Sequence, residues 1–338
     1  MFFMFNNLRR IKKVFFVLVA VCFFVFVLSR GHVYGKNELE YGITFSKKQA
    51  EALNLNWQEV YLSALNELGV KKVRLPAYWN EVEPLDNEYF WDDLDWLINE
   101  SEKAEIEIIL AIGGRLPRWP ECHFPEWIDN FSKEEKEEKM LSYISEVINR
   151  YKENKSIIAW QIENEPFLAH FGECPKLDKE LLDKEIKLAK SMDNRPIVIT
   201  DSGELSIWIP AARRADIFGA TMYRDTYSRQ LKRYIHYPIA PGFFRFKKNI
   251  AGLFAKPDKW VVIELQAEPW GPIPYQYLTA EERGRTMNFK KFREMIEFSS
   301  LTGFKEFYLW GVEYWYWEKK VNGDDGIWEE AKILFNMN

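Results

Sequence analysis

The chain has 338 residues, of which 47% are hydrophobic, so it can bury one large core such as a barrel of about 250 residues with insertions. Its formal net charge is −5 at pH 7, which excludes the basic face that a nucleic-acid-binding protein presents to phosphates. Aromatic residues make up 16% of the chain, including 14 Trp and 16 Tyr, and such amphipathic rings can stack on the apolar faces of sugars.

The amino terminus has the order of an export signal. Basic residues at positions 9, 10, 12 and 13 precede an uncharged apolar run from Val14 to Leu28. This run of 15 residues is shorter than the roughly 20 that span a bilayer, which favours a signal peptide, although an uncleaved membrane anchor remains open. The sequence therefore predicts residues 1–35 as signal peptide or anchor and residues 36–338 as an exported domain, secreted or tethered to the outer face of the cytoplasmic membrane.

Short apolar runs then alternate with amphipathic stretches, which is typical of βαβ units. Eight runs are predicted as strands: Gly42 to Phe45, Lys72 to Leu75, Glu107 to Ile112, Ile157 to Ile162, Ile197 to Thr200, Ile217 to Thr221, Trp260 to Glu264 and Glu306 to Trp310. Apolar residues at three- and four-residue spacing predict helices between them: Trp57 to Leu68, Trp91 to Ala104, Lys133 to Asn154, Lys179 to Met192 and Glu281 to Ser300. Eight alternating units predict an α/β fold closed into a (β/α)8 TIM barrel, which we expect to be a monomer.

The connection from Tyr223 to Lys259 is too long for a simple loop. Its apolar residues predict a helix-bearing insertion that walls a cleft; they are Phe243, Phe244, Phe246, Ile250 and Phe254. A doubly wound open sheet is the competing architecture. It normally carries a glycine-rich turn after an early strand, and the chain has neither that turn nor a Walker sequence.

Two carboxylates stand where predicted strands end, and in a barrel the active site gathers at the carboxyl ends of the strands. Glu165 follows the fourth strand in WQIENEP at 160–166, and Glu264 ends the seventh in WVVIELQAEPW at 260–270. A glycosidic bond needs a proton delivered to its leaving oxygen and an electron-rich group facing the anomeric carbon. Two carboxyl groups across one cleft meet both needs, so the sequence predicts a site that uses no metal and no cofactor.

With its Asn-Glu-Pro motif at 164–166 and with Glu264, the chain resembles the clan A glycoside hydrolases, which include cellulase-like family 5, family 39 and family 42 β-galactosidase-like members. The resemblance spans Tyr41 to about Phe335 and implies that Glu165 is the acid/base and Glu264 the nucleophile of a retaining enzyme acting on a β-linked glycan. Retention requires carboxyls about 5–5.5 Å apart. A non-hydrolytic carbohydrate-binding barrel and a transglycosylase on the same scaffold remain alternatives.

Further residues match by position. The resemblance implies that Arg74, in VRLP at 73–76, orients the nucleophile, that Asn164 donates to the sugar 2-hydroxyl, and that Trp310 floors the subsite where cleavage occurs. Tyr223, which closes the sixth strand, could donate its hydroxyl to the nucleophile. Two tryptophans on expected upper loops are further substrate-binding candidates: Trp79 and Trp270. The chain departs from family 5 after the third strand, where GGRLPRWPE stands in place of the usual histidine.

Two neighbouring carboxylates compete with this assignment. Glu268 is an alternative nucleophile four residues beyond Glu264. Glu163 shares the parity of Glu165 on an extended strand, so we expect it to point into the barrel and to pair with Arg74 in a supporting role.

Two cysteines lie in the exported part of the chain. Cys122 and Cys174 follow the third and fourth predicted strands, which places them on the same rim of the barrel. Neither lies in a CxxC or Cys/His spacing typical of a metal site. An oxidising compartment would let them pair, so the sequence predicts a disulfide.

Overall fold

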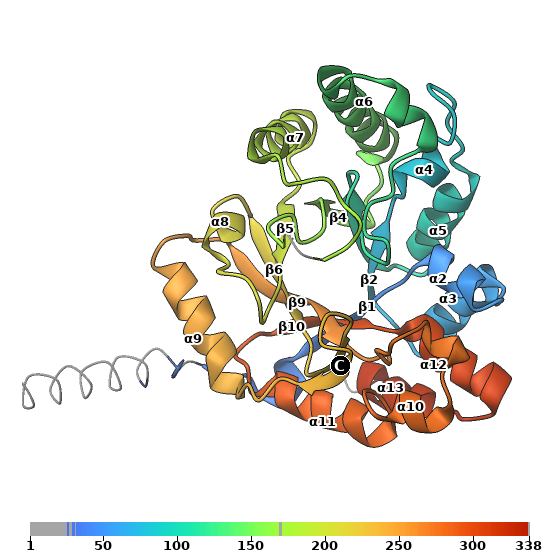
Figure 1. The fold of residues 1–338 in the computed structure, drawn as a ribbon, viewed down its shortest axis with the longest axis vertical. Helices are drawn as coiled ribbons and strands as arrows, with labels where there is room; N and C mark the ends of the chain where they lie inside the picture. The colour runs from blue at the N-terminus through green and yellow to red at the C-terminus, as the bar shows by residue number, and fades with distance from the viewer. Residues whose placement is uncertain (1–25, 27–28, 31, 169–170, 337–338) are drawn as a thin grey trace, which may run out of the picture.

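The computed structural model describes residue 26 and residues 29–30, 32–168 and 171–336, and within them eight parallel strands close into a barrel (Figure 1). Around the barrel the strands follow chain order, and the predicted (β/α)8 fold is confirmed. Each predicted strand is present with ends that differ by at most two residues. The barrel strands are β1 (Glu40–Thr44), β2 (Lys72–Pro76), β3 (Glu107–Ile112), β4 (Ile157–Ile162), β5 (Ile197–Asp201), β6 (Ile217–Met222), β9 (Lys259–Gln266) and β10 (Glu306–Trp310).

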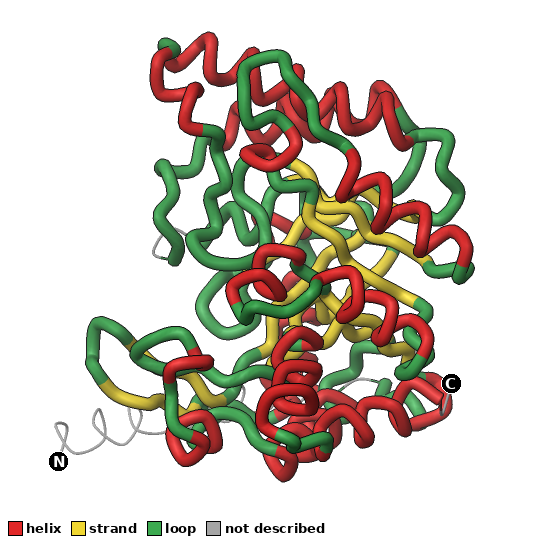
Figure 2. Tube along the Cα trace, turned by 90° about the vertical axis from the view of Figure 1, so that its right-hand side faces the viewer, coloured by secondary structure: helices red, strands yellow, loops and turns green. Residues whose placement is uncertain are grey.

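Helices surround the barrel (Figures 1 and 2). They are α2 (Lys47–Ala52), α3 (Trp57–Asn66), α4 (Trp79–Val82), α5 (Asp92–Lys103), α6 (Lys133–Tyr151), α7 (Lys179–Met192), α8 (Ile209–Ala212), α9 (Pro241–Gly252), α10 (Ala280–Gly284), α11 (Phe289–Ser300), α12 (Val312–Trp317) and α13 (Gly326–Asn336).

The prediction of one continuous helix from Glu281 to Ser300 is wrong. Asn288 has an extended backbone and its side chain accepts a hydrogen bond from the Lys291 amide at 3.0 Å, so it caps the start of a second helix.

The insertion after β6 contains the predicted helix, α9, together with a hairpin that the sequence analysis did not predict. The hairpin pairs β7 (Asp225–Ser228) with β8 (Arg233–His236) in antiparallel register, and Figure 2 shows it standing apart from the barrel strands. Both strands are four residues long and mostly polar, so they lack the apolar alternation by which a strand is recognised.

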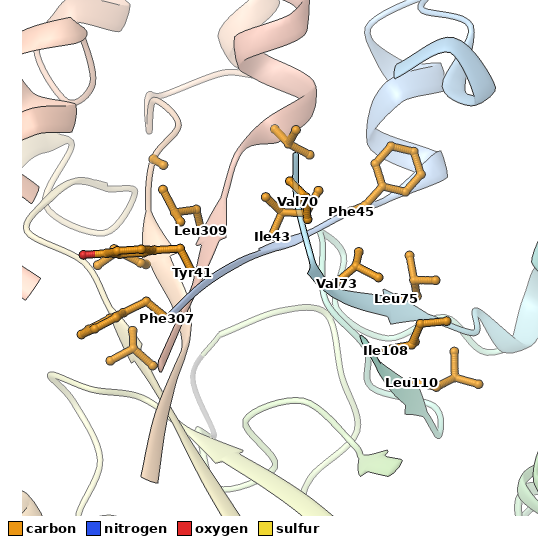
Figure 3. Close-up of a cluster of buried hydrophobic side chains, with 14 of the residues drawn as sticks. Tyr41, Ile43, Phe45, Val70, Val73, Leu75, Ile108, Leu110, Phe307 and Leu309 are labelled. Carbon is orange, nitrogen blue, oxygen red and sulfur yellow. The ribbon is translucent and has the colours of Figure 1, made fainter. Parts of the chain in front are cut away.

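Side chains along each barrel strand alternate between the helix layer and the barrel interior. Figure 3 shows part of the outer layer, in which Val73 and Leu75 of β2 pack with apolar residues of β1, β3 and β10. The inner layer is a separate cluster that includes Ile109, Val198 and Tyr308. Arg74 lies between two outward residues and is therefore directed into the barrel, where it is fully buried.

A bulge in β9 directs Glu264 into the barrel. Val262 pairs with Ala220 of β6, yet the next pair along β6 joins Thr221 to Glu264, so β9 carries one extra residue, Ile263. A regular strand would alternate Ile263 and Glu264 between opposite faces, and an extra residue shifts that alternation by one position. Gly219 makes the shift possible, because a Cβ there would lie 2.9 Å from the Cβ of Ile263.

The apolar run predicted for export, Val14 to Leu28, lies outside the described residues except for Phe26. In the part of the chain that the structure describes, no helix has the length and apolar character of a membrane span. The first described segment lies against α9, where Arg245 Nε donates to the Ser29 carbonyl at 2.8 Å.

A disulfide joins Cys122 to Cys174 and so ties the loop after β3 to the loop after β4. The two cysteines are 52 residues apart, and closing a loop of this length removes unfolded-state entropy equivalent to about 4 kcal/mol. We expect the Cys122→Ser, Cys174→Ser double variant to lose about that much free energy of unfolding in urea titrations under non-reducing conditions. Wild type pretreated with reductant is the control, and a double variant as stable as the oxidised protein would contradict the expectation.

Candidate active site

Arg74 connects three strands from within the barrel. Its guanidinium donates from Nη1 to Glu264 Oε1 at 2.7 Å, from Nη2 to Asn164 Oδ1 at 2.6 Å and from Nε to Gln161 Oε1 at 2.7 Å. The arginine belongs to β2, Gln161 to β4, Asn164 to the turn after β4, and Glu264 to β9. A rigid planar fork of this kind fixes the direction of each acceptor as well as its distance.

Glu264 is held at both carboxylate oxygens. Arg74 donates to Oε1, and the Tyr223 hydroxyl donates to Oε2 at 2.8 Å. Burial raises the pKa of Tyr223 well above its ordinary value, and the charge of Glu264 adds to the rise, so the phenol keeps its proton as a donor. The carboxylate is 3% exposed and has little freedom to rotate.

Glu165 lies beside Glu264 at the carboxyl ends of the strands. Its Oε1 accepts a hydrogen bond at 3.1 Å from the hydroxyl of Thr221, the residue that pairs with Glu264 across β6 and β9. Its backbone N–H donates to Thr200 Oγ1 at 2.7 Å. The φ angle of Glu165 is 43°, in the left-handed region that costs a non-glycine residue about 1–3 kcal/mol and recurs at functional sites.

The surroundings of Glu165 oppose its ionisation. Burial raises the pKa of its carboxyl well above the ordinary value, and the charges of Glu264, Glu121 and Asp201 raise it further, in that order. The charge of Arg115 acts in the opposite direction but does not offset this rise, and the hydrogen bond to Oε1 comes from the Thr221 hydroxyl. The site therefore contains one carboxyl whose surroundings favour its protonated form, Glu165, beside one that accepts hydrogen bonds from two donors, Glu264.

Glu121 is a third carboxyl of the same site. Asn164 Nδ2 donates to Glu121 Oε2 at 3.0 Å, while the Oδ1 of that asparagine accepts from Arg74. Burial raises the pKa of Glu121 to about 8, with the charge of Glu264 as the next cause. The backbone of Glu121 has a φ of 75°, and the disulfide of the neighbouring Cys122 ties its loop to the loop after β4.

Two more carboxyls flank the site from the β5 side. Glu204 accepts from the Tyr223 backbone N–H at 2.8 Å, and burial raises its pKa to about 8. Burial also raises the pKa of Asp201 to about 6 and lowers that of nearby Lys247 to about 8. Among the described residues no group of three or more His, Cys, Asp or Glu side chains is placed to hold a metal ion.

Trp310 and Glu268 belong to a network next to these carboxyls. Glu268 Oε1 accepts from Trp310 Nε1 at 2.7 Å and from Arg118 Nη1 at 2.5 Å. The Arg118 guanidinium also donates to Glu313 and lies 4.1 Å from the centre of the Trp310 ring. The contacts of Glu268 fix Trp310 and Arg118, whereas Arg74 and Tyr223 hold Glu264.

Two expectations about individual residues are wrong. Trp79 does not face a ligand: it is 0% exposed and stacks on Tyr143 in the outer core, at a centroid distance of 5.2 Å. Glu163 does not pair with Arg74, because its carboxylate accepts from the backbone N–H groups of Gly114 and Arg115 at 2.8 and 2.6 Å. The strand ends at Ile162 and Glu163 has a φ of 57°, so strand parity no longer applies there.

Trp270 lies next to Tyr223 in a chain of aromatic contacts. Its ring is 5.3 Å from Tyr223 and 5.8 Å from Phe171, which in turn is 6.1 Å from Trp119. Trp119 is 48% exposed, and Arg229 of the hairpin loop lies 4.5 Å from its centre. Loops that follow β3, β4, β6 and β9 thus meet through aromatic and cation–π contacts.

The sequence analysis did not identify Glu121, Arg118, Gln161, Asp201 or Glu204 as site residues. Glu121 and Arg118 follow the end of β3 within the GGRLPRWPE segment, so the rule that polar residues after a strand end face the site could have found them. Gln161 lies inside an apolar strand, where a polar residue signals an interior partner.

Arg74 offers a test of how the site is held together. We expect Arg74→Met to lower the free energy of unfolding by about 3–5 kcal/mol, because Glu264 is left buried without its cation. Denaturant titration at neutral pH measures the loss. Arg74→Lys is the control, since it keeps the charge but not the planar fork, and we expect an intermediate stability. A methionine variant as stable as wild type would contradict the role assigned to the ion pair.

The chain is similar to known carbohydrate-active proteins. Residues 40–206 match the family model described as Cellulase (glycosyl hydrolase family 5), a segment that includes Glu165 and ends before Glu264. A stretch of 164 residues is 26% identical to Beta-galactosidase BgaA of Clostridium cellulovorans and covers 43% of this chain and 25% of that protein. The match thus spans about a quarter of the length of that curated relative.

Solved structures share the fold at low sequence identity. The native xylanase 10B of Thermotoga maritima has a TM-score of 0.56 at 15% identity, with 82% of this chain and 84% of that chain covered. The exo-β-1,4-mannosidase Op5Man5 of Opitutaceae bacterium strain TAV5 has a TM-score of 0.56 at 13% identity, with 88% and 59% covered. The family-model match and the curated relative confirm the resemblance to glycoside hydrolases of clan A, and the solved structures show the shared fold.

Proposed function

We propose, from this similarity to the clan A glycoside hydrolases, that the chain is a glycosidase that cleaves a β-linked oligo- or polysaccharide with retention of configuration. Glu264 is the nucleophile and Glu165 the acid/base. The observation that supports this best is the contrast between two buried carboxyls in one site: Arg74 and Tyr223 hold both oxygens of Glu264, while burial and neighbouring charges keep a proton on Glu165.

In the first step an oxygen of Glu264 bonds to the anomeric carbon as the bond to the leaving oxygen breaks. Glu165 gives its proton to that oxygen, which its raised pKa equips it to do at neutral pH. Arg74 and Tyr223 keep the attacking carboxylate in one orientation. Asn164 contributes a donor for the sugar 2-substituent, a contact that strengthens in an oxocarbenium-like transition state.

In the second step a water molecule replaces the sugar on Glu264. Once the glycosyl–enzyme ester has formed, Glu264 carries no charge, so one of the causes that raise the pKa of Glu165 is removed. Glu165 then accepts a proton from water while the water oxygen bonds to the anomeric carbon and Glu264 leaves. Two displacements on opposite faces retain the configuration.

The anomer released first by the enzyme tests this proposal. A panel of aryl β-glycosides and soluble β-glucans, mannans, xylans and galactans identifies a substrate, and proton NMR then follows the first product before mutarotation. The β-anomer is expected; the α-anomer would contradict retention. Affinity without release of reducing sugar would identify a carbohydrate-binding barrel, and elongated oligosaccharides would identify a transglycosylase.

We also propose that residues 36–338 form the catalytic domain of an exported protein, with residues 1–35 as signal peptide or anchor. The disulfide between Cys122 and Cys174 supports an oxidising compartment, where such bonds persist. The amino-terminal mass of the chain recovered from the producing cell distinguishes cleavage from anchoring, and recovery of the chain in the cytoplasm with both thiols free would contradict export.

A further inference from the structure

Glu121 forms no bond to the substrate and transfers no proton in the proposed mechanism. It is 4% exposed, and its backbone is fixed by hydrogen bonds of 2.7 Å from its N–H to the Arg118 carbonyl and from the Leu116 N–H to its own carbonyl. The adjacent Cys122 is tied to the loop after β4. A side chain held this firmly has a defined position relative to Glu264 and Asn164.

The contact of Glu121 with Asn164 indicates which part of a bound sugar Glu121 would face. On the proposed function, the asparagine amide nitrogen donates to the substituent at C2, and an amide nitrogen has two hydrogens to give. One of them is directed to Glu121 Oε2. The C2 substituent and the Glu121 carboxyl therefore share one donor group and lie next to each other. Within the described residues, Oε1 of Glu121 accepts no hydrogen bond, which leaves it available to a ligand.

Ionising a buried carboxyl at this position costs free energy, which is unnecessary if the side chain serves only to orient Asn164. Burial and the charge of Glu264 both oppose ionisation of Glu121. A glutamine would accept the same hydrogen bond from Asn164 without that cost. A positive charge on the ligand changes the balance, because a cation next to Glu121 favours the ionised form of its carboxyl.

We propose that Glu121 determines specificity for glycans whose reacting sugar carries a free amino group at C2, a 2-amino-2-deoxyhexoside, and that its carboxylate accepts hydrogen bonds from the ammonium group. The proposal rests on the proposed function and names its substrate class. An N-acetylated sugar lacks the charge and adds bulk between Asn164 and Glu121, so it is a poor substrate.

Matched pairs of aryl β-glycosides test the inference on the wild-type enzyme. Each pair shares one configuration, gluco, galacto or manno, and differs only in a hydroxyl or an amino group at C2. We expect kcat/KM to be at least about tenfold higher for the amino member of the preferred pair, the effect of a hydrogen bond to a charged group. A preference for the hydroxyl member in every pair that is cleaved would overturn the inference and leave the proposed function standing.

Glu121→Gln isolates the charge, because it keeps the size of the side chain and the acceptor for Asn164. We expect the variant to lose the preference for the amino sugar through a fall in kcat/KM on that substrate, while its melting temperature stays close to that of wild type. An unchanged preference would overturn the proposal; if the variant does not fold, the wild-type pairs decide. If no glycoside is cleaved at all, the proposed function fails, and calorimetric titration with glucosamine and glucose still decides whether the site prefers the cation.

Discussion

Replacement of Glu264 by Gln is expected to lower kcat on every glycoside by at least about four orders of magnitude. The amide keeps the size of the carboxylate and still accepts from Arg74, but it cannot form the glycosyl–enzyme ester. Steady-state kinetics on an aryl glycoside measures the loss, and circular dichroism checks that the barrel is intact. A Glu264→Gln variant that retained full activity would exclude this residue as the nucleophile.

Azide distinguishes the loss of a nucleophile from general damage to the site. In Glu264→Ala the small anion can occupy the space of the missing carboxylate and attack the anomeric carbon directly. The product is then a glycosyl azide of inverted configuration. Glu268→Ala is the matched comparison, since it removes a carboxylate from the network of Arg118 and Trp310. Formation of the inverted azide by the Glu268 variant in place of the Glu264 variant would transfer the nucleophile role to Glu268.

Replacement of Glu165 by Gln is expected to lower kcat/KM by about 10²–10⁴-fold on substrates with poor leaving groups. Activated aryl glycosides need little protonation, so they should keep most of their first-step rate. The pH profile of wild type should lose activity as the pH rises through the raised pKa of Glu165, because the acid form is the active one. That alkaline limb should be absent in the variant.

Leaving groups of graded acidity make the test quantitative. A series of aryl glycosides should give a steeper dependence of rate on leaving-group pKa for the variant than for wild type. If the variant lost the same fraction of its rate on every member of the series, Glu165 would act on substrate binding and not on the leaving group. An alkaline limb that persists unchanged in the variant would assign it to a different group, such as Glu204, whose pKa is raised by burial to about 8.

The barrel was predictable because each strand is a short apolar run bounded by polar residues, and eight such runs alternate with amphipathic helices. Glu165 and Glu264 could be singled out because strand ends face one rim of a barrel. The bulge that turns Glu264 inward could not be predicted, since Ile263 and its neighbours read as an ordinary buried strand. The hairpin β7–β8 was not predicted because its strands are short and mostly polar, so they show no apolar alternation.

Trp79 shows the limit of reasoning from position alone. It follows β2 closely enough to be expected on an upper loop, yet it begins α4 and packs against Tyr143 of α6. A tryptophan carries enough apolar surface to be drawn under a neighbouring helix, and its indole N–H is satisfied there by Glu83 at 2.7 Å. The place of Glu121 after β3 could have marked it as a site residue, but its hydrogen bond with Asn164, 43 residues away in sequence, could not be predicted.

The guanidinium of Arg74 joins β2 to β9, which are not neighbours in the wall but are separated by β1 and β10. Such a bridge can exist only after the last strands of the chain have taken their places beside the first. If the proposed function is correct, recovery of glycosidase activity during refolding therefore reports closure of the barrel, because a partly formed barrel has secondary structure but does not bring Arg74 to Glu264.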